Sequence, residues 1–188
     1  KAGTLLMLGY TINEIKDKTN YLNSSTKKIA IKKAIFPWSR FPAEDTMLGP
    51  EMKATGEVLG IGKDFGTALN KAYAAAGVEI GDKEKGVFVT LSDAEKPNFI
   101  EVVNKYIDLE FSIYATEGTA SFLKENNIES IIVGRADDES PTSLTIIEEK
   151  LISIVINTPT FANEYTDGWK IRRLSHETGV AVVSSVRE

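Results

Sequence analysis

The chain has 188 residues, of which 42% are hydrophobic and 26% charged, a composition typical of a globular protein with one or two domains. The net charge of −5 at pH 7, without any block rich in lysine and arginine, argues against a nucleic-acid partner. The absence of cysteine excludes disulfides, thiolate nucleophiles and zinc–thiolate sites. The single His176 excludes metal sites built from several histidines.

The sequence shows no targeting signal. No apolar run is long enough to span a membrane, and no signal-peptide pattern is present, so we expect no membrane partner. A chain without cysteine suits a reducing compartment, which favours the cytoplasm. The chain begins at Lys1, without methionine, and enters an apolar stretch from Ala2 to Leu8. We take this start as the interior of a longer protein.

The first 63 residues do not form an evident domain. A short helix is expected from Gly3 to Met7, and the alternation of isoleucine with lysine predicts a half-buried strand over Lys27–Phe36. One strand and a partial helix cannot bury a core, so this region needs further material to pack against. Asp64 as N-cap and Gly77 as the stop predict a helix between them.

The segment Leu48–Gly60 combines three glycines with charged residues. It is too polar for a core strand and too rich in glycine for a helix. Glycine allows the backbone to approach a ligand closely. The segment is therefore predicted to be a loop, either at the plain surface or beside a ligand.

From about residue 84 to the end, strands alternate with helices. The candidate strands are short, continuous and β-branched, as expected for parallel strands buried on both faces. They are residues 86–91, 111–115, 130–133, 152–156 and 180–183, with helices at 96–107, 119–126, 143–150 and 169–177. This pattern predicts an α/β fold with a doubly wound, parallel, five-stranded sheet.

Polar side chains follow four of these strands at their carboxyl ends, where open parallel sheets bind their ligands. They are Thr90, Lys96, Thr116, Gly118, Thr119, Arg135, Asn157 and Thr158. Hydroxyls, a glycine and two cations near helix N-termini suit a phosphate group. The sequence therefore predicts a phosphate-type anion site, with simple helix capping by the threonines as the alternative.

Other polar residues of this region carry weaker signals. Glu117 opposes a bound phosphate by its charge. The acidic loop Asp137–Glu139 favours a solvated turn over a metal site. Arg172 and Arg173 suit an anion, but such a pair more often divides between a salt bridge and solvent. His176 has no neighbouring serine or acid pattern, and we interpret it as a helix-end cation or a surface residue.

The whole chain resembles a known family. Ile35–Phe41 and Leu48–Val58 resemble the end of the last ATP-grasp domain of the carbamoyl-phosphate synthase large subunit, and Met7–Gly9 also fits. The later motifs resemble the regulatory domain of that family, which has the methylglyoxal-synthase-like fold. They are Thr90, Lys96, Ala115–Thr119, Ile156–Thr158 and Ile171–Arg173. The resemblance implies an ATP-grasp remnant with a connecting helix over residues 1–83 and an allosteric domain over 84–188.

The resemblance implies the regulatory C-terminal part of a glutamine-hydrolysing carbamoyl-phosphate synthase. This ATP-dependent ligase makes carbamoyl phosphate from bicarbonate, glutamine-derived ammonia and two ATP, for arginine and pyrimidine synthesis. Its ATP and Mg²⁺ (or Mn²⁺) are held by residues that would precede Lys1. We therefore expect no cofactor, metal or catalysis in this chain alone. The implied partners are the rest of the large subunit and the small glutaminase subunit.

The resemblance also implies two ligand sites. Family members bind UMP or IMP by its phosphate, a role that falls here on Thr90, Lys96, Thr116, Thr119, Asn157 and Thr158, with Arg135 in place of a common lysine. Glu57, Asp167 and Ser184 fall on plausible positions for an activator of the ornithine type. Pro159, Glu117 and Arg135 depart from the family pattern and leave the effector open.

Two other functions remain as alternatives. The first is methylglyoxal synthase acting on dihydroxyacetone phosphate, with Asp137 or Asp138 as the base. The chain lacks the Gly-Gly-Asp motif of that enzyme and has Gly134-Arg135-Ala136 instead. The second is an interaction module that forms a homo-oligomer through a surface around Tyr165 or Trp169.

Overall fold

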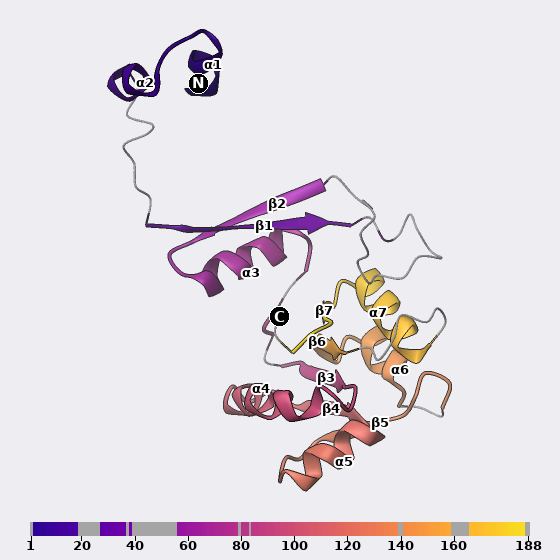
Figure 1. Ribbon diagram of the computed structural model, residues 1–188. Coiled ribbons are helices and arrows are strands. Elements are labelled where there is room, and N and C mark those ends of the chain that lie inside the picture. The colour runs from indigo at the N-terminus through magenta and orange to yellow at the C-terminus, as the bar shows by residue number, and fades with distance from the viewer. Residues whose placement is uncertain are drawn as a thin grey trace.

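A computed structural model of the chain describes residues 2–18, 27–36, 38, 56–78, 80–82, 84–138, 141–158 and 166–186 (Figure 1). The helices are α1 (Ala2–Met7), α2 (Ile12–Lys18), α3 (Phe65–Ala75), α4 (Lys96–Asp108), α5 (Glu117–Glu125), α6 (Ser143–Glu148) and α7 (Asp167–Thr178). The strands are β1 (Ile29–Ile35), β2 (Gly56–Gly62), β3 (Gly86–Thr90), β4 (Ile113–Thr116), β5 (Ile131–Val133), β6 (Ile152–Asn157) and β7 (Ala181–Val183).

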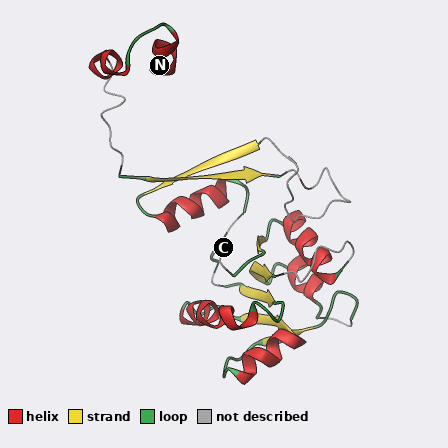
Figure 2. Ribbon diagram, in the orientation of Figure 1, coloured by secondary structure: helices red, strands yellow, loops and turns green. Residues whose placement is uncertain are grey.

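The larger sheet has five parallel strands in the order β5-β4-β3-β6-β7. The predicted doubly wound parallel sheet is therefore confirmed. Helices lie on both sides of it (Figure 2). Every residue of β6 is buried, and so are the first four residues of β3, because both faces of these central strands are covered.

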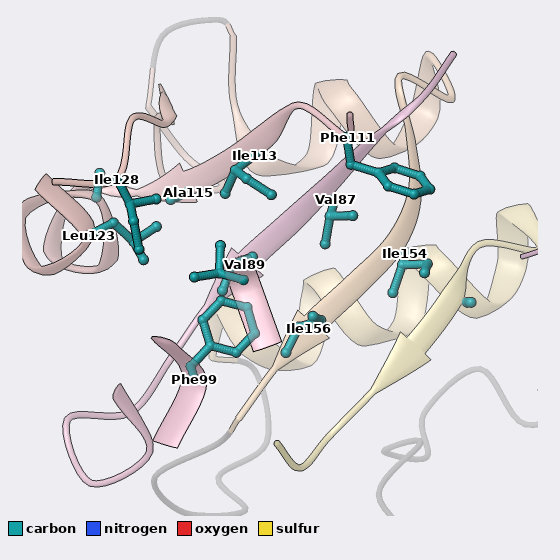
Figure 3. Packing of buried hydrophobic residues seen from close by; sticks show 13 residues of the cluster. Val87, Val89, Phe99, Phe111, Ile113, Ala115, Leu123, Ile128, Ile154 and Ile156 are labelled. Carbon is teal, nitrogen blue, oxygen red and sulfur yellow. The ribbon is translucent and has the colours of Figure 1, made fainter. Parts of the chain in front are cut away.

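Each face of the large sheet has its own apolar core. On one face, Val87, Val89, Ile154 and Ile156 pack with Phe99 and with other residues of α4 and α5 (Figure 3). On the opposite face, residues of β3 and β6 pack against α6 and α7. That second cluster is Phe88, Val133, Ile146, Ile147, Ile152, Val155, Ile171 and Val180. The alternation of side chains along each strand supplies both cores.

The strand order places a ligand crevice at one edge of the sheet. From β3 the chain first builds β4 and β5 on one side, and then crosses over to build β6 and β7 on the other. Such a reversal leaves a crevice at the carboxyl ends of the strands next to the switch point. Thr90, Thr116 and Asn157 end β3, β4 and β6 at that edge.

The glycine-rich segment is partly a strand, so the predicted loop is wrong over Gly56–Gly60. Strand β2 pairs antiparallel with β1, from Ile29 opposite Gly62 to Ile35 opposite Gly56. Gly60 and Gly62 face α3, and a Cβ added at Gly60 would lie 2.6 Å from the Ala72 nitrogen. The glycines that argued against a strand are what lets the helix pack onto it. Residues 48–55 lie outside the described part.

Helix α2 was not predicted, although the sequence holds a signal for it. The Thr11 nitrogen donates to the Glu14 carboxylate at 2.8 Å, and the Glu14 nitrogen donates to the Thr11 hydroxyl at 3.3 Å. This reciprocal pair is a capping box, whose sequence signature is Thr followed three residues later by Glu. The hydrogen bond from the Thr11 backbone, more than any other contact, holds the pKa of Glu14 below its usual value.

The prediction for α3 is confirmed at both ends. The Asp64 carboxylate accepts a 2.7 Å hydrogen bond from the Thr67 nitrogen, which also lowers the pKa of Asp64. Gly77, at φ 79°, follows the end of the helix in the left-handed conformation that glycine favours. Val78 and Ile80 then pack against the core of the large sheet.

The domain boundary at residues 83 and 84 and the ATP-grasp remnant stay predictions. Among the described residues, no helix is both long and apolar enough to cross a membrane.

The packing of α3 on β2 yields a stability prediction. Gly60→Ala should lower the free energy of unfolding by about 2 kcal/mol or more, because its methyl group would overlap the backbone of Ala68 and Ala72. Gly66→Ala is the matched control, since nothing but the Asp64 carboxylate, at 3.7 Å, lies near the added atom. It should leave stability unchanged or raise it by up to about 1 kcal/mol. Urea denaturation of both variants measures the difference, and equal stabilities would contradict the packing.

Candidate functional site

A pocket of about 540 Å³ lies at the carboxyl ends of β3, β4 and β5 and at the start of α7. Its wall includes six residues of the predicted phosphate site, namely Thr90, Lys96, Thr116, Gly118, Thr119 and Arg135. The rest of the wall is Leu91, Asp93, Glu117, Ile132, Val133, Gly134, Asp138, Ser143, Asp167, Gly168 and Ile171. We call this cavity the rim pocket. Residues predicted to follow three different strands thus share one cavity.

The N-terminus of α5 opens into the rim pocket. Its N-cap residue, Thr116, has extended backbone and makes no side-chain capping hydrogen bond. The first N–H groups of a helix have no partner within the helix and carry partial positive charge. A Cβ added at Gly118 would meet nothing within 4 Å, so this backbone is open to close approach. An anion therefore has access to unpaired donors here.

Three threonine hydroxyls line the same side of the pocket. The Thr116 hydroxyl lies 3.5 Å from that of Thr90 and 3.4 Å from that of Thr119. The Thr119 hydroxyl also accepts a 3.1 Å hydrogen bond from the Leu91 nitrogen, which ties α5 to the end of β3. The simple capping role is thus not what Thr116 performs. The two hydroxyl–hydroxyl distances are long, so these groups retain capacity to bond a ligand.

Lys96, at the start of α4, is one of the two cations in the pocket wall, and it is already paired. Its Nζ lies 2.6 Å from the Asp93 carboxylate. The Lys96 side chain is 17% exposed, whereas that of Asp93 is 94% exposed. The hydrogen bond from Lys96 lowers the pKa of Asp93, so this acid stays ionised at neutral pH. Any anion that Lys96 binds has to compete with Asp93.

The acidic loop after β5 is an exposed turn, as predicted, and its two described carboxylates have partners. Asp138 accepts a 2.7 Å hydrogen bond from the Arg135 nitrogen. Asp137 pairs with Lys170 at 2.8 and 2.9 Å, a contact that raises the pKa of Lys170. Asp137 does not line the rim pocket, so it is poorly placed as a base for a ligand there.

Carboxylates outnumber cations in the wall of the rim pocket. The cations are Lys96 and Arg135, and the acids are Asp93, Glu117, Asp138 and Asp167. Glu117 and Asp167 lie in the first turns of α5 and α7, where the helix dipole stabilises negative charge. These acids weaken the attraction for a dianion and offer acceptors to ligand hydroxyl or N–H groups. The opposition expected from Glu117 therefore extends to three further acids.

Two predicted phosphate ligands, Asn157 and Thr158, are buried and do not belong to the pocket wall. They are 4% and 5% exposed. The Thr158 hydroxyl accepts a 2.8 Å hydrogen bond from the Ser92 nitrogen, and the Asn157 amide oxygen accepts one of 2.8 Å from Arg172. Arg172 and Arg173 are 2% and 6% exposed, so neither faces solvent. Pro159, the departure next to this pair, lies outside the described residues.

The three predicted activator ligands fall on separate elements. Asp167 begins α7 and lines the rim pocket, whereas Glu57 lies on β2, where its carboxylate contacts Lys32 at 2.8 Å. Ser184 follows β7 and does not line the rim pocket. The structure therefore brings Asp167 to the predicted nucleotide site rather than to Glu57, and the activator assignment stays a prediction.

Among the residues of the pocket wall that sequence reasoning missed are Ser143 and Gly168. The Ser143 hydroxyl is fully buried and has no hydrogen-bond partner among the described residues. Gly168 lies against the Arg172–Asn157 pair, since an added Cβ would be 3.2 Å from the Arg172 guanidinium. Ser143 resembles an ordinary residue of a helix start, so no sequence signal marked it. Asp93 was also missed, but its position three residues before Lys96 is typical of a local ion pair.

Residues 98–184 match the family model of the MGS-like domain. The matched residues include β4, β5, β6 and β7, so the match covers most of the parallel α/β sheet. Beyond the domain itself, nearly the whole chain is similar to carbamoyl phosphate synthase large chains, as the resemblance implied.

Three relatives illustrate this similarity. The "Carbamoyl phosphate synthase large chain, C-terminal section" of Aquifex aeolicus is 38% identical over 90% of this chain and 31% of its own length. The protein of the same name from Methanocaldococcus jannaschii is 37% identical over 99% of this chain and 31% of its own length. The "Carbamoyl phosphate synthase large chain" of Lachnoclostridium phytofermentans is 43% identical over 84% of this chain and 15% of its own length. The chain thus spans less than a third of the length of these relatives.

These findings give no support to methylglyoxal synthase. None of the three relatives has that name, and the predicted bases Asp137 and Asp138 are tied to Lys170 and to the Arg135 backbone.

The Lys96–Asp93 pair yields a binding prediction. Asp93→Asn should raise the affinity of the rim pocket for inorganic phosphate by up to about fivefold, because it frees Lys96 from an exposed ion pair of modest strength. Asp108→Asn, at the far end of the same helix, is the matched control and should leave affinity unchanged. Phosphate titrations followed by NMR compare both variants with the parent chain. Weaker binding by Asp93→Asn would show that Asp93 supports the anion site.

Proposed function

We propose that this chain is the regulatory C-terminal part of a carbamoyl-phosphate synthase large subunit and binds a phosphate-bearing effector in the rim pocket. One observation carries the proposal: the uncapped N-terminus of α5 and the hydroxyls of Thr90, Thr116 and Thr119 open into one cavity with Lys96. The similarity to large chains over most of the sequence supports the same assignment.

The phosphate group would lie at the N-terminus of α5. The backbone N–H groups of the first turn of α5, around Gly118, would donate to the phosphate oxygens. The threonine hydroxyls would add further hydrogen bonds, and Lys96 would supply positive charge. The buried Ser143 hydroxyl, which also lines the pocket, would offer one more donor. Lys96 would have to exchange its contact with Asp93 for the phosphate.

The remainder of the pocket suits a nucleoside. A volume of about 540 Å³ lies within the range of small-molecule sites. Asp138 and Asp167 provide acceptors for ribose hydroxyls or for base N–H groups, while Ile132 and Ile171 provide apolar wall. UMP and IMP both combine a phosphate with such groups. These acids favour a ligand that carries donors over inorganic phosphate alone.

The chemistry of carbamoyl phosphate formation belongs, in this proposal, to the rest of the large subunit. ATP and Mg²⁺ (or Mn²⁺) would bind there, ammonia would come from the small glutaminase subunit, and the whole enzyme would work in the cytoplasm. The region around β1 and β2 would be the end of the ATP-grasp domain. Its exposed apolar face, with Leu59 57% and Ile61 43% exposed, supports a contact with further chain. The present chain alone should not make carbamoyl phosphate from ammonia, bicarbonate and ATP.

Calorimetric titration of the chain with UMP and IMP tests the effector site. We expect saturable binding of at least one nucleotide at or below millimolar concentration, and binding weakened by about tenfold or more in Lys96→Gln, because a charge-assisted hydrogen bond is lost. Lys105→Gln is the matched control. It removes an exposed cation from the last turn of the same helix and should leave affinity unchanged.

Ornithine is titrated in the same way, and Glu57→Gln tests the predicted activator site.

No heat with either nucleotide at millimolar concentration would overturn the proposed effector binding. An equal loss of nucleotide affinity in the Lys96 and Lys105 variants would place the anion elsewhere.

A further inference from the structure

Helix α7 carries two adjacent buried arginines that contact different parts of the chain, Asn157 on β6 and Trp38 after β1. Arg172 is 2% exposed and Arg173 is 6% exposed. Successive residues of a helix point about 100° apart, so one helix can direct two such side chains to different parts of the molecule. Buried charges are costly unless they are paired and hydrogen-bonded, so their contacts constrain the position of the helix.

Arg172 lies directly beneath the wall of the rim pocket. Its guanidinium donates a 2.8 Å hydrogen bond to the amide oxygen of Asn157, at the carboxyl end of β6. Gly168 forms part of the pocket wall and lies over this pair. A Cβ added there would be 3.2 Å from the guanidinium and 3.5 Å from both amide atoms. A shift of the wall at Gly168 would therefore press on the Arg172–Asn157 pair.

Hydrogen bonds continue from the end of β6 to the anion-binding side of the pocket. Next to Asn157, the Thr158 hydroxyl accepts from the Ser92 nitrogen at 2.8 Å. The preceding residue of that loop, Leu91, donates from its nitrogen to the Thr119 hydroxyl at 3.1 Å. These hydrogen bonds connect the ends of β3 and β6 with the start of α5 and with α7.

Arg173 contacts the chain that follows β1. Its Nη2 donates to the Trp38 carbonyl at 2.8 Å, and its Nε donates to Glu177 at 2.6 Å. The Trp38 ring lies 5.8 Å from the ring of His176, which is also on α7, and 5.1 Å from the ring of Phe36, the residue that follows β1. Trp38 is 7% exposed. The chain just after β1 is therefore docked on α7.

We propose that α7 couples the rim pocket to the end of β1, with Arg172 as the positioning residue on the pocket side and Arg173 as the one on the Trp38 side. Ligand bound at Thr119 and Gly168 shifts α7 through the Arg172–Asn157 pair. The shift reaches Trp38 through Arg173, and from there the strand pair β1–β2. The inference rests on the proposed effector site for its ligand and adds the path by which that site regulates the N-terminal region.

Fluorine NMR measures the coupling at its far end. The chain has two tryptophans, Trp38 and Trp169, so 5-fluorotryptophan labelling gives two signals, which Trp169→Phe assigns. The whole chain is titrated with UMP and with IMP. We expect the Trp38 signal to shift in parallel with binding measured by calorimetry. Nucleotide binding that leaves the Trp38 signal unmoved would overturn the proposal.

Arg173→Gln then tests the link itself. We expect nucleotide affinity within about threefold of the parent chain, because Arg173 does not line the pocket, but no ligand-induced shift of Trp38. Lys105→Gln on α4 is the control and should keep the shift. If Arg173→Gln fails to fold, Arg173→Lys takes its place, since a single ammonium cannot hold both Trp38 and Glu177 as the guanidinium does. A Trp38 shift that persists in the folded variant contradicts the role of Arg173.

A ligand-free measurement decides the coupling even if no nucleotide binds. Asn157→Ala removes the acceptor of Arg172, and hydrogen exchange at the Trp38 nitrogen, which donates to Phe36, reports the other end. We expect exchange at Trp38 to accelerate by about fivefold or more relative to the amide of Val103 in α4.

Two further variants complete the comparison. Asn157→Asp retains an acceptor for Arg172 and should restore the protection of Trp38, whereas Asn126→Ala, at the end of α5, should not alter it. Unchanged exchange at Trp38 in Asn157→Ala would overturn the coupling, whatever the nucleotide titrations show. Absence of nucleotide binding with accelerated exchange would instead overturn the effector site and keep the coupling.

Discussion

The burial of the two central strands, β3 and β6, is the constraint on which the rest of the structure depends. Both strands are covered on both faces, so neither face tolerates water or an unpaired polar group. Inside these strands the one polar side chain, Ser153, donates to the Gly86 carbonyl, and the other polar side chains lie at the carboxyl ends. Thr90 and Asn157 end these strands side by side in register, and the polar site begins at that pair. The location of the rim pocket is in this sense a consequence of the core.

Much of this arrangement could be predicted from the sequence, because the signals were local and repeated. The β-branched strands, the helix stops and the Asp64 cap each follow from a few neighbouring residues, and the carboxyl-edge rule then gathered Thr90, Lys96, Thr116 and Thr119 into one site. Apart from α2 and Asp93, whose signals are local, what failed depended on contacts between residues far apart in the sequence. Gly60 looked unsuitable for a strand until the backbone of α3 was seen against it.

The degree of burial of each site residue could not be predicted from the sequence either. Asn157 follows a strand as Thr116 does, and no local pattern tells that one is buried against Arg172 while the other lines a cavity. The same limit applies to charge. Four carboxylates join two cations in the pocket wall because loops from different strands converge there. Electrostatic balance is a property of the assembled edge of the sheet, and it favours a ligand that carries both negative charge and hydrogen-bond donors.

The close packing of α3 on glycine has a mechanical consequence. A helix that rests on side chains can slide by exchanging rotamers, but α3 lies with Ala68 and Ala72 against the bare backbone of Gly60 and Gly62, where no rotamer can yield. The hairpin and its helix therefore have to move as a single rigid body.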